Sequence, residues 1–410
     1  MPMAKRLSRQ DLLGGAVLVA GLIIPVILYF ALGAFWAYDV KTWFLTGQMA
    51  YEHGLFSPYS LQAGMSSEFP GGYYNYPMPW LLFCYAAYAA KQAFSLDIAQ
   101  WMYLVRLPEL VFTLASALLL HFWLRPRIGE RGAALAAFAF TVFPGIANVV
   151  FGPIIGYFDP IPVFFSLFAL VLFERKRLDW AALSLGLGAA FKYYPLLMLP
   201  VFLLSLKRKE DAVKFATLAA LPLLIVSIPP LVYDAGAYIR ASTFISDWAG
   251  STSLYRLAYS ALGWDTHLWF GKAVPPGVDL SLLPIVSAAS TLILLAAVLL
   301  AYAAFYRRKL PLNDGILLVM LALLGFWRFA EHNHALWAFP FAAAVLFTSP
   351  RLRPFAAIWL LAVFLMSLSY VLLVPDWFEP ASAMLVPLAS IAFYVAIAWS
   401  GRSAGTLKKK

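Results

Sequence analysis

Charged residues are scarce in this 410-residue chain, and so is cysteine. Asp, Glu, Lys and Arg make up only 12% of the residues and hydrophobic residues 63%, whereas soluble domains are about 25% charged and roughly 45–50% apolar. A soluble protein of this composition could not keep its surface hydrated, and a disordered chain would be more polar. The single cysteine, Cys84, cannot form an internal disulfide, which excludes a disulfide framework and a cysteine-based metal site.

Other signals are missing as well. The chain has no Asn-x-Ser/Thr motif, and its terminal LKKK lacks the lysine spacing of an endoplasmic-reticulum retrieval signal, which favours a prokaryotic plasma membrane. No internal repeat of the kind found in many transporters is visible. No soluble domain is expected at either end.

The apolar residues gather in runs, and a bilayer core takes about 20 helical residues. Pro195 interrupts the apolar stretch 180–206, and because proline disfavours helix at the preceding residue, two short helices are predicted there. Segment 12–33 is too long for the apolar core of a signal peptide and is interpreted as a retained first span. The remaining candidate runs lie near 77–95, 104–124, 132–150, 156–173, 213–233, 283–305, 313–330, 335–349, 355–374 and 381–400.

Basic residues mark one side of the membrane. Of the 30 Lys and Arg residues, 22 lie in seven short clusters, and the positive-inside rule places these in the cytoplasm together with both termini. An even number of crossings is then required of thirteen candidate segments, so we expect 77–95 to be re-entrant or interfacial. The clusters are at 5–9, 125–131, 175–177, 207–214, 307–309, 351–353 and 402–410.

These patterns predict an all-α fold: a polytopic membrane helix bundle of roughly 12 transmembrane helices, forming a single membrane domain over 1–410. Two outer loops, 34–76 and 234–282, are long enough to contain helices, and 402–410 is a basic cytoplasmic tail. Outside the clusters only eight basic residues remain, and 13 of the 20 acidic residues share with them the outer or intramembrane part of the chain. The net charge of +10 therefore reports topology, and no nucleic-acid partner is expected.

Three charged residues on the predicted outer side stand in apolar surroundings. Asp39 follows the first span by about one turn, where a carboxylate is costly unless it is paired or used; it is either a general base or an ordinary interfacial aspartate. Asp159 either caps the helix that begins at Pro160 or contributes to a site. Lys192 lies at the break in 180–206, either with an anionic partner such as a lipid phosphate or extended toward the interface.

Arg328, Glu331, His332 and His334 fall within seven positions at the junction of two spans. Arg328 is three and four residues before Glu331 and His332, so the three residues would share one face of a helix. The His-x-His pair beside a glutamate has the composition of a zinc site, but a third ligand is not evident. A histidine that orients a carboxylate is the more economical interpretation, and no metal is predicted.

Five motifs in this order resemble those of the GT-C superfamily of integral-membrane glycosyltransferases. The chain looks most like the bacterial polyprenyl-phosphate-mannose-dependent α-mannosyltransferases, such as those that extend phosphatidylinositol mannosides. It departs from them in having a lone Asp39, followed by Val40, where many members carry an acidic pair, and in Gly-Tyr-Phe-Asp where Gly-Gln-x-Asp is common. The motifs are Asp39; Gly54 and Pro58-Tyr59 leading to Tyr76-Pro77-Met78-Pro79; Gly156-Tyr157-Phe158-Asp159; Lys192-Tyr193-Tyr194-Pro195; and His334-Ala335-Leu336-Trp337-Ala338-Phe339-Pro340.

The resemblance implies that a sugar, with mannose expected, moves from a polyprenyl-phosphate donor to a lipid or glycan acceptor at the outer face of the plasma membrane, with inversion. It implies no cofactor, because the donor is a co-substrate. A leaving phosphate needs cations or donors to stabilise its charge. The implied residues are Asp39, His332, His334 and Glu331 for catalysis, Lys192, Tyr193, Arg256 and Arg328 for the donor phosphate, and Asp159, Tyr76 and Trp337 for substrate contacts.

Two other functions fit parts of the pattern. A flippase for lipid-linked sugars, or a small-solute transporter, would use Lys192 and Arg106 along a path. However, alternating access needs polar residues reachable from both sides, and here they gather at one face. A non-catalytic subunit of a larger transferase complex would also lack a soluble domain.

Overall fold

The computed structural model describes residues 9–32, 38–60, 74, 76–142, 158–242, 252–261, 281–371 and 378–400, and every regular element in these ranges is a helix. The predicted all-α class is therefore confirmed. The helices are α1 Arg9–Leu32, α2 Tyr38–His53, α3 Ser57–Ser60, α4 Met78–Ala93, α5 Ile98–Val142, α8 Pro160–Glu174, α9 Leu178–Phe191, η2 Tyr194–Met198, α10 Leu199–Ser205, α11 Lys209–Ser242, α12 Tyr255–Ala261, α13 Leu283–Arg308, α14 Leu312–Phe326, η4 His332–His334, α15 Ala335–Thr348, α16 Arg353–Val371 and α17 Phe378–Trp399.

Four helices in the described part of the chain are long and apolar enough to cross a membrane, judged by length and composition: Asp11–Ala31, Ile98–Val142, Lys209–Ser242 and Leu283–Arg308. Six further apolar segments have 10–17 residues. At 1.5 Å per residue these reach about 15–25 Å, less than the roughly 30 Å of a bilayer core. The helices support an integral membrane protein, while the number of twelve crossings stays a prediction.

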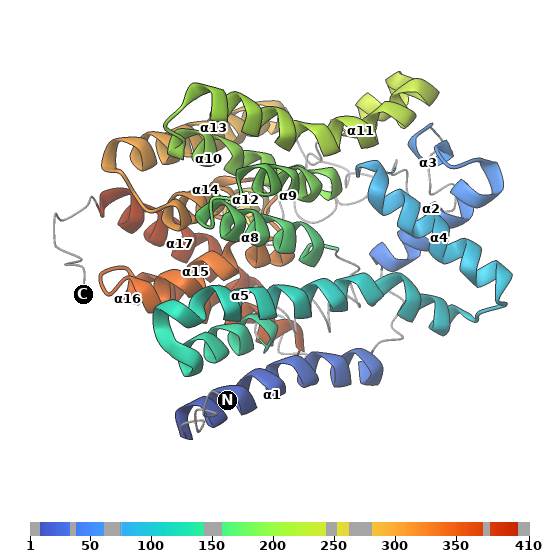
Figure 1. Cartoon of the computed structure of the whole chain (residues 1–410). Coiled ribbons are helices and arrows are strands. Elements are labelled where there is room, and N and C mark those ends of the chain that lie inside the picture. Colours follow the sequence, from blue (N-terminus) through green and yellow to red (C-terminus); the bar gives the residue numbers. More distant parts are fainter. Residues whose placement is uncertain are drawn as a thin grey trace.

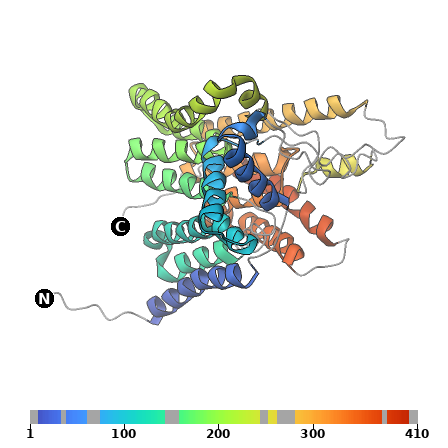
Figure 2. The ribbon, with the colours of Figure 1, turned by 90° about the vertical axis from the view of Figure 1, so that its right-hand side faces the viewer.

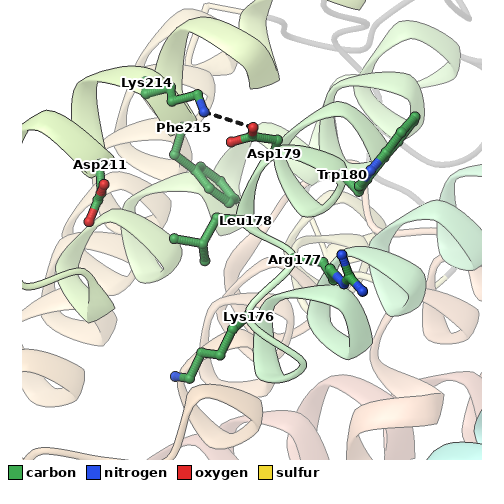
Figure 3. A pocket seen from close by; sticks show the side chains of 8 residues that line it. All are labelled: Lys176, Arg177, Leu178, Asp179, Trp180, Asp211, Lys214 and Phe215. Carbon is green, nitrogen blue, oxygen red and sulfur yellow. Dashed lines mark hydrogen bonds and ion pairs between the residues drawn. The ribbon is translucent and has the colours of Figure 1, made fainter.

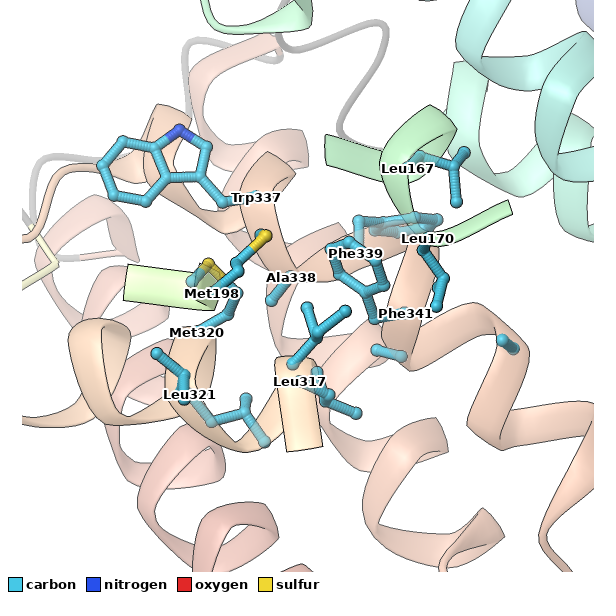
Figure 4. Close-up of a cluster of buried hydrophobic side chains, with 14 of the residues drawn as sticks. Leu167, Leu170, Met198, Leu317, Met320, Leu321, Trp337, Ala338, Phe339 and Phe341 are labelled. Atoms are coloured by element: carbon cyan, nitrogen blue, oxygen red, sulfur yellow. The ribbon is translucent and has the colours of Figure 1, made fainter. Parts of the chain in front are cut away.

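Helices of the first half of the chain are stacked beside one another (Figure 1). Helix α1 packs on α5, α5 on α8, α8 on α9 and α9 on α11, from the bottom to the top of that view. Helices α14 and α15 form the centre of the core, and residues 316–322 of α14 are fully buried. A helix that is apolar all round is expected to be enclosed in this way. Figure 4 shows Leu317 and Met320 of α14 in one cluster with Phe339 of α15.

Two predicted breaks lie where the sequence indicated them. The basic stretch 125–131 interrupts α5 at Gly129, whose φ of 77° is a left-handed value that glycine adopts without strain. Helix α9 ends at Phe191 and η2 begins at Tyr194, with Lys192 extended between them (φ −153°, ψ 134°). The division of 180–206 into two short helical pieces is therefore confirmed.

Both predicted outer loops contain helices. Loop 34–76 holds α2 and α3, and loop 234–282 begins at a kink in α11, at Asp234 (φ −156°, ψ 91°). The Asp234 Oδ1 accepts a hydrogen bond from the Ala237 amide at 2.8 Å, so this side chain caps the final helical stretch of α11. The tail 402–410 lies outside the described residues.

Helices α2 and α4 lie across one end of the bundle (Figure 2). They approach closely because α2 has Gly47 at the crossing, where an added Cβ would overlap the backbone oxygen of Cys84. One turn earlier, Trp43 packs edge-on against Trp80 of α4, with ring centroids 4.7 Å apart. This contact positions the helix that carries Asp39 in its first turn.

Replacing Gly47 by alanine is expected to lower the free energy of unfolding by about 1–3 kcal/mol, the usual cost of overpacking, because α2 must move away from α4. Thermal unfolding of the purified protein in detergent measures the loss. Gly15→Ala in α1 is the matched control: nothing lies within 4 Å of a Cβ there, and alanine in a helix is up to about 1 kcal/mol better than glycine. Equal melting temperatures of the two variants would contradict this contact.

Candidate active site

The carboxylate of Asp159 is the centre of a buried polar network. Asp159 lies just before α8 and is fully buried. Its Oδ1 and Oδ2 are 2.8 and 3.0 Å from Lys192 Nζ. The Asn333 Nδ2 donates to Oδ2 at 2.7 Å, and Trp337 Nε1 donates to Oδ1 at 2.5 Å. Donors from α15, from the turn before it and from the break after α9 thus converge on one carboxylate, as a buried charge requires.

The structure contradicts the capping interpretation of Asp159. The residue has helical backbone angles (φ −54°, ψ −30°), and its side chain makes no capping hydrogen bond to α8. An N-cap residue normally has extended backbone angles, with its side chain turned back to the helix amides. Here the carboxylate points instead to side chains of other elements, which leaves Asp159 available to hold Lys192.

Lys192 has the anionic partner that a cation in apolar sequence was expected to need. The side chain is 15% exposed, whereas Asp159 is not exposed at all. Three aromatic rings surround the ammonium group: the centroids of Tyr76, Phe158 and Trp337 are 5.8, 5.4 and 5.5 Å from Nζ, within the range of cation–π attraction. An ammonium group has three donors, and the two Asp159 oxygens use two of them. The remaining exposure of Lys192 leaves room for one further acceptor.

Stacked rings hold the two sides of this network together. The ring of Tyr194, two residues after Lys192, lies 3.9 Å from that of Trp337 at an interplanar angle of 7°. Trp337 also contacts the imidazole of His334 at 4.1 Å. Rigid aromatic contacts of this kind restrict side-chain freedom. They therefore fix the position of the break after α9 relative to the start of α15.

The turn before α15 is closed by a reciprocal capping pair. The Glu331 amide donates to His334 Nδ1 at 2.9 Å, and the Glu331 side chain accepts a hydrogen bond from the His334 amide. His332 Nδ1 lies 3.6 Å from Glu331 Oε2. The capping pair presents Asn333 to Asp159. Glu331 and His334 therefore have a structural task in the turn, in addition to any part in catalysis.

Arg328 and Arg256 belong to a neighbouring cluster around α12. Arg328 is buried, and its Nη1 donates to the Tyr259 hydroxyl at 3.2 Å. The Thr252 amide donates to the Ala330 carbonyl at 3.1 Å, which joins the chain before α12 to the turn that leads to η4. The structure thus places α12, which carries Arg256, beside the 327–331 segment.

Tyr193 takes a different direction from Lys192. Burial raises the pKa of the Tyr193 phenol, and the neighbouring hydroxyl groups are those of Tyr238 and Ser242 at the end of α11. The structure gives no contact between Tyr193 and Asp159, so its role toward the donor phosphate stays a prediction.

Asp39 lies in the first turn of α2, and its side chain is outside the described residues. Trp43 is one turn further along the same helix and therefore shares its face. The Trp43 ring lies 6.3 Å from that of Phe158, and Phe158 in turn flanks Lys192. This aromatic wall connects the face of α2 with the Asp159–Lys192 pair.

Sequence reasoning gave no role to Asn333 or to Phe158. Asn333 stood between the two histidines that drew attention, and the only available signal was an uncharged amide in an apolar junction. Phe158 is next to Asp159 and is one aromatic residue among 33 phenylalanines. Among the side chains that the structure describes, no group of three or more His, Cys, Asp and Glu residues forms a candidate metal site.

Part of the chain that contains this site is similar in sequence to a known protein family. Residues 155–255, about a quarter of the chain, match the model of the family described as Mannosyltransferase (PIG-M). The chain is similar to mannosyltransferases over this segment. Both Asp159 and Lys192 lie inside it. The expected resemblance to membrane glycosyltransferases is confirmed, and the narrower likeness to bacterial phosphatidylinositol-mannoside enzymes stays a prediction. No curated protein sequence matches the chain.

Solved structures overlap this chain only loosely. The apo oligosaccharyltransferase of Archaeoglobus fulgidus is 16% identical with a TM-score of 0.44, and the overlap covers 96% of this chain and 57% of that one. ArnT from Cupriavidus metallidurans, solved with bound undecaprenyl phosphate, is 12% identical with a TM-score of 0.44, covering 94% and 77%. The chain thus spans a little over half the length of the archaeal enzyme.

Trp337→Phe is expected to lower the free energy of unfolding by about 1.5–3 kcal/mol, because it removes a hydrogen bond to a charged group and keeps the ring that stacks on Tyr194. Trp359→Phe is the matched control, since the buried Trp359 Nε1 donates to the neutral Ser390 Oγ at 2.9 Å and its loss costs about 0.5–1.5 kcal/mol. Denaturant unfolding in detergent compares the two. A larger loss for Trp359→Phe would contradict a charged network at Trp337.

The stability of the protein should fall in mild acid because of His334. Burial, and then the charges of Lys192 and His332, hold the pKa of His334 well below its ordinary value of 6.5. The folded protein then binds fewer protons than the unfolded chain, so the stability from neutral His334 is complete above pH 6.5 and decreases as the pH falls below it.

Melting temperatures between about pH 7.5 and 5 test this linkage. The loss on acidification should be steeper for the wild type than for His334→Gln, whose amide does not titrate. His53→Gln, at the exposed end of α2, is the control and should follow the wild type. Parallel curves for the wild type and His334→Gln would show that His334 does not carry the effect.

Proposed function

We propose that the protein is a membrane glycosyltransferase that moves a sugar, with mannose expected, from a polyprenyl-phosphate donor to a hydroxyl group of a lipid or glycan acceptor. The match to a mannosyltransferase family over residues 155–255 supports this. So does the apolar, all-helical architecture, which suits a donor with a long hydrocarbon tail. The observation that carries the proposal is the pairing of Lys192 with Asp159 inside an aromatic enclosure.

In this proposal, Lys192 stabilises the leaving phosphate of the donor. The bond between the anomeric carbon and the phosphate oxygen breaks, and its electron pair stays on the phosphate, where negative charge develops. A preorganised cation in a site of low dielectric stabilises such charge effectively. Asp159 and its partners Asn333 and Trp337 hold the ammonium group in place before the donor binds.

Asp39 is proposed to act as the general base. It would take the proton of the acceptor hydroxyl while the oxygen attacks the anomeric carbon opposite the leaving phosphate, which inverts the configuration in one displacement. Arg256 and Arg328 are proposed as further cations for the phosphate, Tyr193 as a donor to it, and Tyr76 as part of the wall that faces the sugar. His332, and through the turn His334 and Glu331, would orient the acceptor. Because these cations can balance a monophosphate, the proposal includes no metal and no cofactor.

The arrangement along α8 and α9 supports an outer-face site. Asp159 and Lys192 lie at the end where α8 begins and α9 ends, whereas the basic cluster 175–177 lies at the turn between these helices. The positive-inside rule places that cluster in the cytoplasm. The proposed site then faces the outside of a plasma membrane, with both termini inside.

Asp39→Asn in the purified full chain should reduce sugar transfer by at least about 100-fold, the lower range for loss of a general base, with little change in melting temperature. The assay measures the product formed from polyprenyl-phosphate mannose and membrane lipids. Asp97→Asn is the matched control, because Asp97 is exposed and caps the start of α5 through the Gln100 amide, a task that asparagine performs equally well. Undiminished transfer by Asp39→Asn would remove Asp39 from the mechanism.

The donor and the reaction class are tested in the same assay with a panel of polyprenyl-phosphate sugars. Mass spectrometry should detect an acceptor that has gained one hexose, with the mannose donor preferred. Transfer from another sugar donor would correct the proposed donor sugar, and the protein would still be a glycosyltransferase. Passage of the lipid-linked sugar across vesicles without a covalent product would replace the proposal by a flippase.

A further inference from the structure

A surface pocket of about 400 Å³ lies at the end of α8 and α9 that is remote from Asp159. It is bounded by the turn between these two helices and by the start of α11 (Figure 3). Leu178 and Phe215 contribute apolar lining, and Lys176, Arg177 and Lys214 contribute three cations. Helix α8 has 15 residues, which separates the pocket from Asp159 by about 22 Å along the helix axis.

The cations of this pocket are only partly balanced. Lys214 Nζ contacts Asp179 Oδ2 at 2.7 Å, as Figure 3 shows, and Asp211 is the other carboxylate in the lining. Lys176 and Arg177 are exposed, and neither forms an ion pair within the part of the chain that the structure describes. Lys207, Arg208 and Lys209 precede the α11 lining residues in the chain and are exposed, and Arg208 is paired with Glu210 at 3.4 Å. A local excess of positive charge over a concave surface attracts anions.

Exposed apolar side chains of α9 and α11 form a wall next to this pocket. Trp180 lines the pocket and is 66% exposed. Helices α9 and α11 pack together. Only 17% of the most apolar stretch of α11 is buried inside the protein. Tryptophan and lysine at the end of such a wall are typical of the headgroup level of a membrane. The exposed apolar side chains of this wall are Leu187, Leu221, Leu224, Ile225 and Ile228.

We propose that this pocket binds the phosphate of an anionic phospholipid whose acyl chains lie along the α9–α11 wall. Lys176 and Arg177, whose side chains extend in opposite directions in Figure 3, turn toward the phosphate oxygens when the lipid binds, and Trp180 packs at the level of the glycerol. A membrane lipid fits better than free phosphate, because only a lipid covers the exposed apolar side chains and neutralises the cations at once. By the positive-inside rule this lipid belongs to the cytoplasmic leaflet.

Tryptophan quenching by brominated lipids tests the site on the full chain in detergent. The difference in fluorescence between the wild type and Trp180→Phe isolates Trp180 from the other tryptophans. Brominated phosphatidylglycerol should quench this signal at about tenfold lower concentration than brominated phosphatidylcholine. The double variant Lys176→Gln/Arg177→Gln should weaken quenching by phosphatidylglycerol about 30-fold, the order expected for two lost basic contacts near anionic lipid.

The matched control is Arg307→Gln/Arg351→Gln, which removes the same charge from exposed residues of two other basic clusters and should leave the quenching at Trp180 unchanged. Equal weakening by both double variants would mean that the lipid responds only to the overall positive charge of the protein. That result would overturn the proposed binding site. Equal quenching by the two lipids would overturn the selectivity for an anionic headgroup. Displacement of the lipid by millimolar inorganic phosphate would show that the pocket takes free phosphate instead.

Discussion

The ion pair between Asp159 and Lys192 joins two helix ends that are 33 residues apart in the chain. Removing charges from water costs several kcal/mol per ion, and the attraction between them repays this only with good geometry and further hydrogen bonds. Asn333 and Trp337 supply those bonds. The start of α8, the break after α9 and the turn before α15 must therefore meet at one place, and the aromatic rings around them form the walls of the candidate site.

The same pair of helices gives the protein two chemically different ends. At one end α8 begins with the buried network, beneath the layer formed by α2 and α4. At the other end the turn between α8 and α9 carries exposed cations beside the proposed lipid pocket. Such an arrangement separates a site that needs low dielectric from the charges that orient the chain in the membrane.

The sequence indicated most of the helices and several of the residues of the network, but it did not indicate their partners. Asp159 was interpreted either as a helix cap or as part of a site. The structure rejects the helix cap, because three donors from distant elements bind its carboxylate. Asn333 was overlooked beside two histidines, although it is the side chain of that turn that reaches Asp159. His334 was considered for its imidazole chemistry, and the structure adds a role in closing the turn.

Sequence alone determined the all-helical class, the interruption of α5 in the basic stretch 125–131 and the break at Lys192, because apolar runs, charge clusters and proline act on the chain within a few residues. Only the tertiary structure decided that Asp159 pairs with Lys192, 33 residues away, and with Trp337, 178 residues away. Which buried charges meet depends on how the helices pack, and packing is set by contacts summed over the whole bundle.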